Sequence, residues 1–98
     1  MANLLKPSQA GTLESGDVMV TLVPAESGSG IFVELESLVL LQYGAAIRQT
    51  VKDVFLTAGI VDAKIHLIDR GALDCTIRAR LKAAISRAGG SEGGASHA

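Results

Sequence analysis

The chain has few of the residues from which disulfide frameworks and metal centres are built. Its 98 residues include one cysteine, Cys75, and two histidines, His66 and His97. A lone cysteine excludes an internal disulfide and fits a reducing compartment. Because metal ligation needs several histidine, cysteine or carboxylate groups that converge, we expect no metal site.

Aromatic side chains are also scarce, since Phe32, Tyr43 and Phe55 are the whole set. A base-stacking platform needs exposed aromatics among basic residues, and the net charge of −1 gives no general attraction to nucleic acid. No segment approaches the length of a membrane span, and the chain does not begin with the apolar run of a secretion signal. We therefore expect a soluble, cytoplasmic protein that binds neither nucleic acid nor membrane.

What the chain does have is a large apolar share, 48%, which favours a globular fold. We expect a single domain over residues 1–88 and a flexible Gly/Ser-rich tail over residues 89–98. Residues 1–37 carry one base against five acids, whereas residues 70–88 carry five bases against one acid. These two segments are either docking surfaces for partners of opposite sign or solvated faces that simply differ.

Three segments alternate with the period of a strand: 18–23, 31–36 and 61–68. Both faces of the first segment are mostly apolar, which favours a central or covered strand. The Gly- and Ser-rich stretch 24–30 predicts an antiparallel hairpin between the first two strands. Residues 1–10 have no clear pattern, and we interpret them as a frayed arm.

Two segments have helical spacing. Ser37 is the predicted N-cap of a helix that runs to Ala58, and Gly59 is its predicted C′ residue. The second helix ends at Gly89-Gly90. The predicted buried stripes are Leu40, Tyr43, Ile47, Val51, Val54 and Ala58 in the first helix, and Leu73, Ile77, Leu81, Ala84, Ile85 and Ala88 in the second.

The order strand, strand, helix, strand, helix predicts an α+β fold. A helical crossover between the second and third strands makes those two strands parallel if they share a sheet. The simplest architecture is a two-layer sandwich, in which a three-stranded mixed sheet carries two helices on one face.

A catalytic set is hard to find. A nucleophile elbow at Ser15 would need glycine where Leu13 stands, and His66 is expected to point outward from a strand into solvent. The run Gly28-Ser29-Gly30 begins like a dinucleotide fingerprint, but a strand follows it instead of a helix. Cys75 falls opposite the buried stripe with no activating base in the sequence, so we interpret it as structural. We predict that the chain is not an enzyme on its own.

Ser15 lies between Glu14 and Gly16, in a segment that precedes the first predicted strand. A neighbouring glycine leaves the serine hydroxyl sterically open, although Ser-Gly-Asp by itself is typical of a plain turn. The run Ala10–Met19, AGTLESGDVM, resembles the first signature of the citrate lyase acyl carrier proteins, the gamma subunits of that complex. The run Gly71–Leu81, GALDCTIRARL, resembles their second signature. The resemblance covers residues 8–88.

This resemblance implies that Ser15 carries a covalent arm, 2′-(5″-phosphoribosyl)-3′-dephospho-CoA, whose terminal thiol holds an acetyl or citryl thioester. It also implies a prosthetic-group transferase as a partner, together with the alpha and beta subunits of citrate lyase. The arm would move between the transferase and lyase subunits while citrate is cleaved to acetate and oxaloacetate. Glu14 and Gly16 would serve attachment and recognition, and the basic second helix would contact partner subunits or the phosphates of the arm.

Two alternatives stay open at this point. The chain could be the carrier of a related citramalate lyase or malonate decarboxylase, or it could be a non-covalent assembly subunit. Fatty-acid carriers differ, because they are four-helix bundles with an Asp-Ser-Leu motif at the start of a helix.

Overall fold

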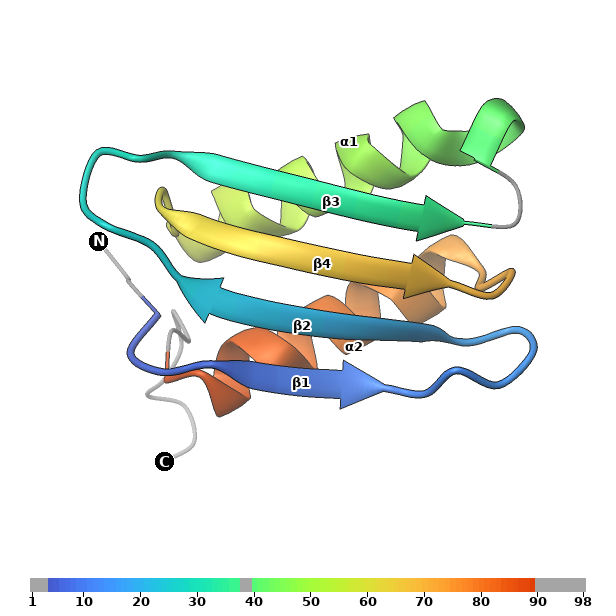
Figure 1. Cartoon of the computed structure of the whole chain (residues 1–98), viewed down its shortest axis with the longest axis horizontal. Helices are drawn as coiled ribbons and strands as arrows, with labels where there is room; N and C mark the ends of the chain where they lie inside the picture. The colour runs from blue at the N-terminus through green and yellow to red at the C-terminus, as the bar shows by residue number, and fades with distance from the viewer. Residues whose placement is uncertain (1–3, 38–39, 90–98) are drawn as a thin grey trace.

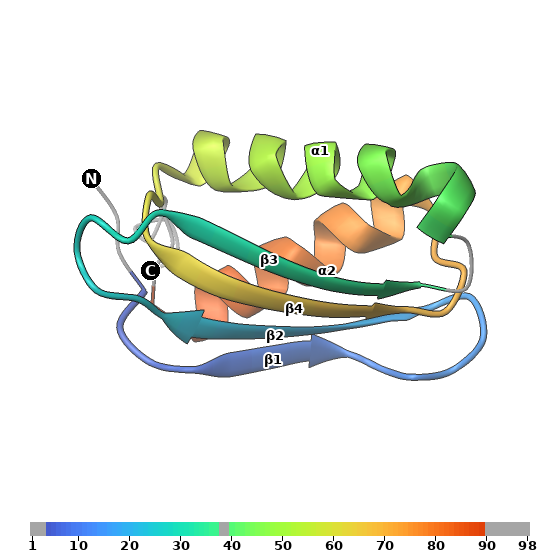
Figure 2. The same ribbon diagram turned by 45° about the horizontal axis from the view of Figure 1, so that its top comes forward.

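The computed structural model describes residues 4–37 and 40–89. Two helices cover one face of a four-stranded sheet (Figures 1 and 2). The elements follow the chain as β1 (Ser8–Gly11), β2 (Val18–Pro24), β3 (Ile31–Ser37), α1 (Leu40–Ala58), β4 (Ala63–Asp69) and α2 (Asp74–Arg87). The predicted α+β two-layer architecture, with both helices on one face, is confirmed.

The strand order across the sheet is β1-β2-β4-β3. β2 is antiparallel to both β1 and β4, and β3 is parallel to β4. The parallel pair is the one that the α1 crossover was predicted to produce. Ile65 of β4 pairs with Leu22 on one side and with Val33 on the other, so β4 is a central strand.

The predicted hairpin between the first two of the expected strands is wrong, because β4 lies between β2 and β3. The two strands are antiparallel in direction, but they do not pair. β4 buries Ala63, Ile65 and Leu67 almost completely beneath the helices. β3 instead exposes Glu34 and Glu36, and exposed charges are typical of a strand at a sheet edge.

The prediction of three strands is also wrong, because part of the expected frayed arm forms β1. Ala10 is 3% exposed, and its strand pairs with β2 over its whole length. Two contacts with α2 secure this short strand: Ser8 Oγ donates to the Ala84 carbonyl oxygen at 2.6 Å, and Arg87 donates to the Gln9 carbonyl oxygen at 2.8 Å.

The core lies between the sheet and the helices. β2 contributes Val18, Val20 and Leu22, each fully buried. Met19 and Thr21 on its other face are half-buried, so β2 is central but is covered on one face only. Most of the predicted helical stripes are buried as expected, including Ile47, Val51, Val54 and Ala58 in α1 and Ile77, Leu81, Ala84, Ile85 and Ala88 near or in α2.

Tyr43 and Leu73 are exceptions to the predicted stripes, because they are 54% and 70% exposed. Tyr43 lies in the first turns of α1 and Leu73 directly precedes α2. Figure 1 shows that both helices begin at the same end of the molecule, where β3 and β4 end.

The end of α1 agrees with its prediction. Gly59 has φ +75°, and it donates from its N–H to the Leu56 carbonyl. Ile60 donates to the Phe55 carbonyl, which completes a Schellman motif. The N-cap predicted at Ser37 stays a prediction, since residues 38 and 39 lie outside the described part of the chain and α1 is described from Leu40. Ser37 ends β3, and its hydroxyl donates to an Asp69 carboxylate oxygen at 2.8 Å.

The predicted tail, residues 89–98, lies outside the described residues except for Gly89. α2 ends at Arg87, and Gly89 has φ +81°, as expected of a terminating glycine. Neither of the two described helices is long and apolar enough to cross a membrane.

Candidate functional site

Ser15 lies in the loop that joins β1 to β2, called here the Ser15 loop (residues 12–17). Asp17 donates its N–H to the Glu14 carbonyl at 3.0 Å, which closes a four-residue turn. Gly16, at the third position, has φ +83°. That value is typical of a type II turn, which requires glycine or asparagine at this position. Gly16 is therefore needed to form the turn that presents Ser15.

The Ser15 side chain is exposed at the second position of this turn. Within residues 4–37 and 40–89, its hydroxyl makes no hydrogen bond. A Cβ on the neighbouring Gly16 would meet nothing within 4 Å, so the space beside the serine is open. A large reagent can therefore reach the hydroxyl without any rearrangement of the chain.

Asp17 holds the loop against α2. Its carboxylate accepts two hydrogen bonds from Arg80, at 3.0 and 2.8 Å, one at each oxygen. It also accepts from the Thr12 hydroxyl and from the Val18 N–H, both at 2.7 Å. Arg80, then Thr12 and Val18, hold the pKa of Asp17 far below its usual range. The carboxylate thus stays charged and fixes the turn.

The loop is also bonded to the connection between β4 and α2. Gly16 donates its N–H to the Arg70 carbonyl at 2.7 Å, and Arg70 donates to the Asp17 carbonyl at 2.9 Å. The fold therefore brings together the two sequence runs that carry the resemblance, since Asp17 belongs to the first and Arg80 to the second. Sequence reasoning had named both runs but not this contact.

Gly11 allows the close approach at the base of the loop. It has φ +99°, and a Cβ on it would lie 1.8 Å from the Val18 carbonyl oxygen. No side chain fits there without displacement of the backbone, so glycine is required on both conformational and steric grounds.

The loop between β2 and β3, called here the Ser29 loop (residues 25–30), has a different support. Asp62 accepts from the N–H groups of Gly28 and Gly30 at 3.1 and 2.8 Å. The Ser29 hydroxyl donates to the Glu26 carbonyl at 2.5 Å. The Ser29 loop lies at the opposite end of the sheet from the Ser15 loop (Figure 1).

The other candidates from the sequence take no part in the Ser15 loop contacts. Cys75 is an exposed free thiol on α2, outside the core as predicted. His66 lies on the face of the sheet that the helices do not cover. It points outward as predicted, its side chain is 38% exposed, and its Nε2 lies 2.8 Å from a Glu36 carboxylate oxygen, a contact that the sequence did not indicate. Over the described residues, no cluster of three or more His, Cys, Asp or Glu could hold a metal ion.

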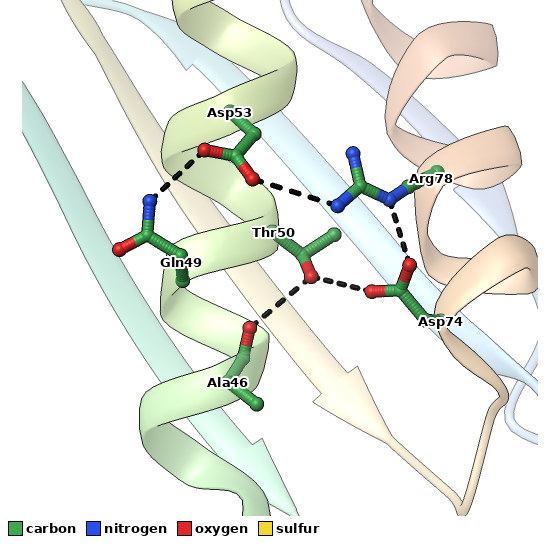
Figure 3. Close-up of polar contacts among 6 residues, drawn as sticks. All are labelled: Ala46, Gln49, Thr50, Asp53, Asp74 and Arg78. Carbon is green, nitrogen blue, oxygen red and sulfur yellow. Dashed lines mark hydrogen bonds and ion pairs between the residues drawn. The ribbon is translucent and has the colours of Figure 1, made fainter.

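A polar network joins the two helices (Figure 3). The buried Thr50 hydroxyl donates to Asp74 at 2.5 Å, and Asp74 accepts from Arg78 at 2.7 Å. Arg78 also lies 3.5 Å from Asp53, which accepts from Gln49. Thr50, then Arg78, lower the pKa of Asp74, and Asp74 raises the pKa of Arg78. The network fixes the start of α2, and its visible sequence signals were the i,i+4 spacings of Asp74 with Arg78 and of Gln49 with Asp53.

Comparison with known proteins places these features in a family. The sequence profile of a family described as the malonate decarboxylase delta subunit (MdcD) matches residues 5–88. Citrate lyase acyl carrier protein 2 of Salmonella typhimurium (strain LT2) is 48% identical over 85 residues, which cover 87% of each chain. The citrate lyase acyl carrier protein of Streptococcus equi subsp. zooepidemicus (strain H70) is 48% identical over 83 residues, which cover 85% of this chain and 80% of that one.

A solved structure has the same fold. A chain of a Pseudomonas malonate decarboxylase hetero-tetramer, crystallised with malonate, superposes with a TM-score of 0.73 and covers 88% of this chain and 87% of its own length. Its identity is 19%, so it supports the fold alone. The chain belongs to the acyl carrier protein family of the malonate decarboxylase delta subunit and the citrate lyase acyl carrier proteins. The predicted family is thereby confirmed, and with it the prediction of a carrier that is not an enzyme on its own.

Proposed function

We propose that this chain is the acyl carrier of citrate lyase and that its acyl group rides on an arm joined covalently to Ser15. The carrier name of the 48% identical relatives supports the role. One structural observation supports the residue: Ser15 is an exposed serine, without a hydrogen bond among the described residues, on a turn that Asp17 and Arg80 hold rigid.

The surroundings of Ser15 fit the proposed group, 2′-(5″-phosphoribosyl)-3′-dephospho-CoA. A phosphodiester at the serine oxygen needs open space, which Gly16 leaves, and a nearby positive charge. Arg70 is exposed and its backbone is bonded to the turn, so its side chain is a candidate for that charge, while Arg80 is already paired with Asp17. Glu14 is the one acid within the turn that has no hydrogen bond from Arg80, and it remains available for recognition by a loading enzyme.

When bound, the group would supply a thiol that forms thioesters, chemistry that no side chain of the Ser15 loop can perform. The chain's own residues do something simpler. The serine oxygen anchors the arm, and the Asp17–Arg80 pair keeps the anchor in one orientation. Tethering replaces diffusion by a high effective concentration, of the order of millimolar for short flexible links, between the alpha and beta subunits that exchange and cleave the acyl group. A prosthetic-group transferase would load the arm, in the cytoplasm.

The second candidate function is the carrier subunit of a related decarboxylase or lyase. The family description names the malonate decarboxylase delta subunit, which favours malonate as an alternative to citrate or citramalate. Activity of the loaded complex on citrate, citramalate and malonate separates these three. The chain is 48% identical to citrate lyase carriers of two bacterial genera but 19% identical to the malonate decarboxylase chain. This difference favours citrate.

The proposed attachment site is tested by loading the purified chain with its transferase and measuring intact mass. Ser15→Ala should fold normally and gain no mass, because the only proposed nucleophilic oxygen is gone. Ser29→Ala, a serine in the other glycine-rich loop, should load like the natural chain. Loading of Ser15→Ala would reject Ser15, and a native chain of bare mass from cells growing on citrate would instead favour a non-covalent assembly subunit.

A further inference from the structure

A hollow of about 340 Å³ opens between the first turns of α1 and the connection from β4 to α2. Its walls are mostly apolar and include Tyr43, Ile47, Ala72, Leu73 and Ile77. The volume lies at the lower end of the range of about 300–1,000 Å³ for sites that bind small molecules. The hollow is therefore large enough for part of a cofactor.

Two features show that this hollow is not a simple gap in the core. Tyr43 and Leu73 are large apolar side chains that stay 54% and 70% exposed beside it, although both follow the buried stripes of their helices. The carboxylates at its edge are already satisfied. Asp69 accepts from Ser37 and from the Ala72 N–H, and Asp74 accepts from Thr50 and Arg78.

The hollow lies next to the proposed anchor. Gly71 lines it, and Gly71 directly follows Arg70, whose carbonyl accepts the N–H of Gly16 at 2.7 Å. Ser15 precedes Gly16, so only one hydrogen bond and a few covalent bonds separate the serine from the rim. Figures 1 and 2 show the β1–β2 loop and the β4–α2 connection at the same end of the molecule.

We propose that this hollow receives the thiol-bearing end of the chain's own arm between catalytic steps, an inference that rests on the proposed function. That end of a CoA-type arm is a chain of methylene and methyl groups interrupted by amides, and it ends in a neutral thiol or acetyl thioester. Such a chain matches an apolar groove. A tether at Ser15 holds it beside the groove at high effective concentration, so even weak intrinsic affinity gives occupancy.

The same chemistry predicts which acyl group stays inside. An acetyl group is small and neutral, and it can enter without loss of solvated charge. A citryl group carries carboxylates, which would lose hydration and approach Asp69 and Asp74. We expect the acetyl form to shelter in the hollow and the citryl form to remain outside, where a lyase subunit can reach it.

Reactivity of the arm's thiol tests this inference. The exposed Cys75 would also react with a thiol reagent, so all proteins carry Cys75→Ala. Loaded protein is treated with an aromatic disulfide such as 5,5′-dithiobis(2-nitrobenzoate), and the rate is compared between the parent, Leu73→Asp and the matched control Leu56→Asp. Leu56 is 81% exposed on α1 and does not line the hollow.

Leu73→Asp should react about five times faster than the parent, the factor expected if the arm is docked roughly 80% of the time. Leu56→Asp should react like the parent. Leu73 is the N-cap residue of α2 and makes no capping bond with its side chain, so aspartate there is compatible with the helix. Tyr43→Ser, on the opposite wall, should also raise the rate and guards against an effect peculiar to position 73.

Nuclear magnetic resonance of the loaded and unloaded parent gives a second readout. Loading should shift the signals of Ala72, Leu73 and Ile77 as well as those of the Ser15 loop. Equal thiol rates in all variants, with shifts confined to residues 12–17 and 70, would overturn the inference. So would an unchanged thiol rate in Leu73→Asp combined with weaker binding of the lyase subunits, because the hollow would then serve a protein partner.

Intact mass keeps this test separate from that of the proposed function. A chain that gains the arm at Ser15 but shows no docking contradicts only the sheltering hollow. A chain that gains no mass under any loading condition contradicts the attachment itself and removes both proposals.

Discussion

The Ser15 loop and the Ser29 loop are similar in sequence but differ in their surroundings. Each has an exposed serine beside a glycine of positive φ, and an aspartate fixes each loop. Asp62 serves the Ser29 loop alone, by accepting two of its N–H groups. Asp17 instead joins the Ser15 loop to Arg80 of α2, and the β4–α2 connection adds two backbone bonds.

The hydroxyls differ as well. Ser29 donates to the Glu26 carbonyl, whereas the Ser15 hydroxyl has no hydrogen-bond partner among residues 4–37 and 40–89. The comparison teaches that the same Ser-Gly dipeptide can stand in two different environments, only one of which leaves that serine hydroxyl without a partner in the described part of the chain. The Ser15 end combines a turn held by Asp17 and Arg80, a serine hydroxyl without a partner among the described residues, and an apolar hollow lined by Gly71.

The largest expected difference between the loops is in stability. Gly11→Ala should lower the free energy of unfolding by about 3 kcal/mol, the sum of a left-handed backbone penalty and an overpacking cost of similar size. Gly30→Ala should cost about 1–2 kcal/mol, because a Cβ there meets nothing within 4 Å. Urea unfolding measures both variants. Equal losses would mean that the base of the Ser15 loop is not closely packed.

A smaller effect should separate the two aspartates. Asp17→Asn removes the charge that Arg80 binds, so the turn should loosen and loading of Ser15 should slow several-fold. Asp62→Asn loosens only the distant loop and should leave loading unchanged. The rate of mass gain measures the loading of Ser15, and the hydrogen exchange of the Gly16 N–H measures how far the turn loosens. Slower loading in both variants would point to a general loss of stability instead of a local role for Asp17.

The smallest effect is a dependence of stability on pH. The pKa of Asp17 is lowered in the folded protein, whereas an unfolded aspartate has a pKa of about 3.9. The stabilisation from Asp17 is therefore complete above about pH 5, and it is lost as the pH falls below about 4 toward the folded pKa. The difference in unfolding free energy between the natural chain and Asp17→Asn should stay constant from pH 8 to 5 and narrow below 4.

Asp74, whose pKa is also lowered, is present in both proteins and cancels from this difference. If the difference in unfolding free energy between the natural chain and Asp17→Asn stays constant down to pH 2, Asp17 contributes no charge-dependent stability. Asp62→Asn, measured over the same range, shows what the aspartate of the other loop contributes.

Local patterns predicted the local structure well. Alternation located the buried faces of β2 and β4, and Gly59 marked the end of α1, because these features depend on nearby residues. The pairing of strands depends on the whole sheet, and there the sequence misled. The stretch 24–30 has the composition of a hairpin turn, yet β4 lies between β2 and β3. The inner face of β4 is buried more completely than that of β3, which fits the central position of β4.

The site was predicted in part for the same reason. Ser15 stood out by its neighbours and by resemblance, and the structure places it on an exposed turn. The contact between Asp17 and Arg80 joins residues that are 63 positions apart, and no short pattern reports it. β1 was missed because its four residues bury only Ala10, and the strand forms through contacts with β2 and α2.

The central claim is that Ser15 alone carries the arm, and peptide mapping of protein from its native host tests it most directly. Trypsin should release one peptide that ends at Arg48 and contains both loops, so fragment ions must locate the added mass within it. The account predicts the mass of the phosphoribosyl-dephospho-CoA arm on Ser15. An unmodified peptide, or the arm on Ser29 or any other residue, would contradict it.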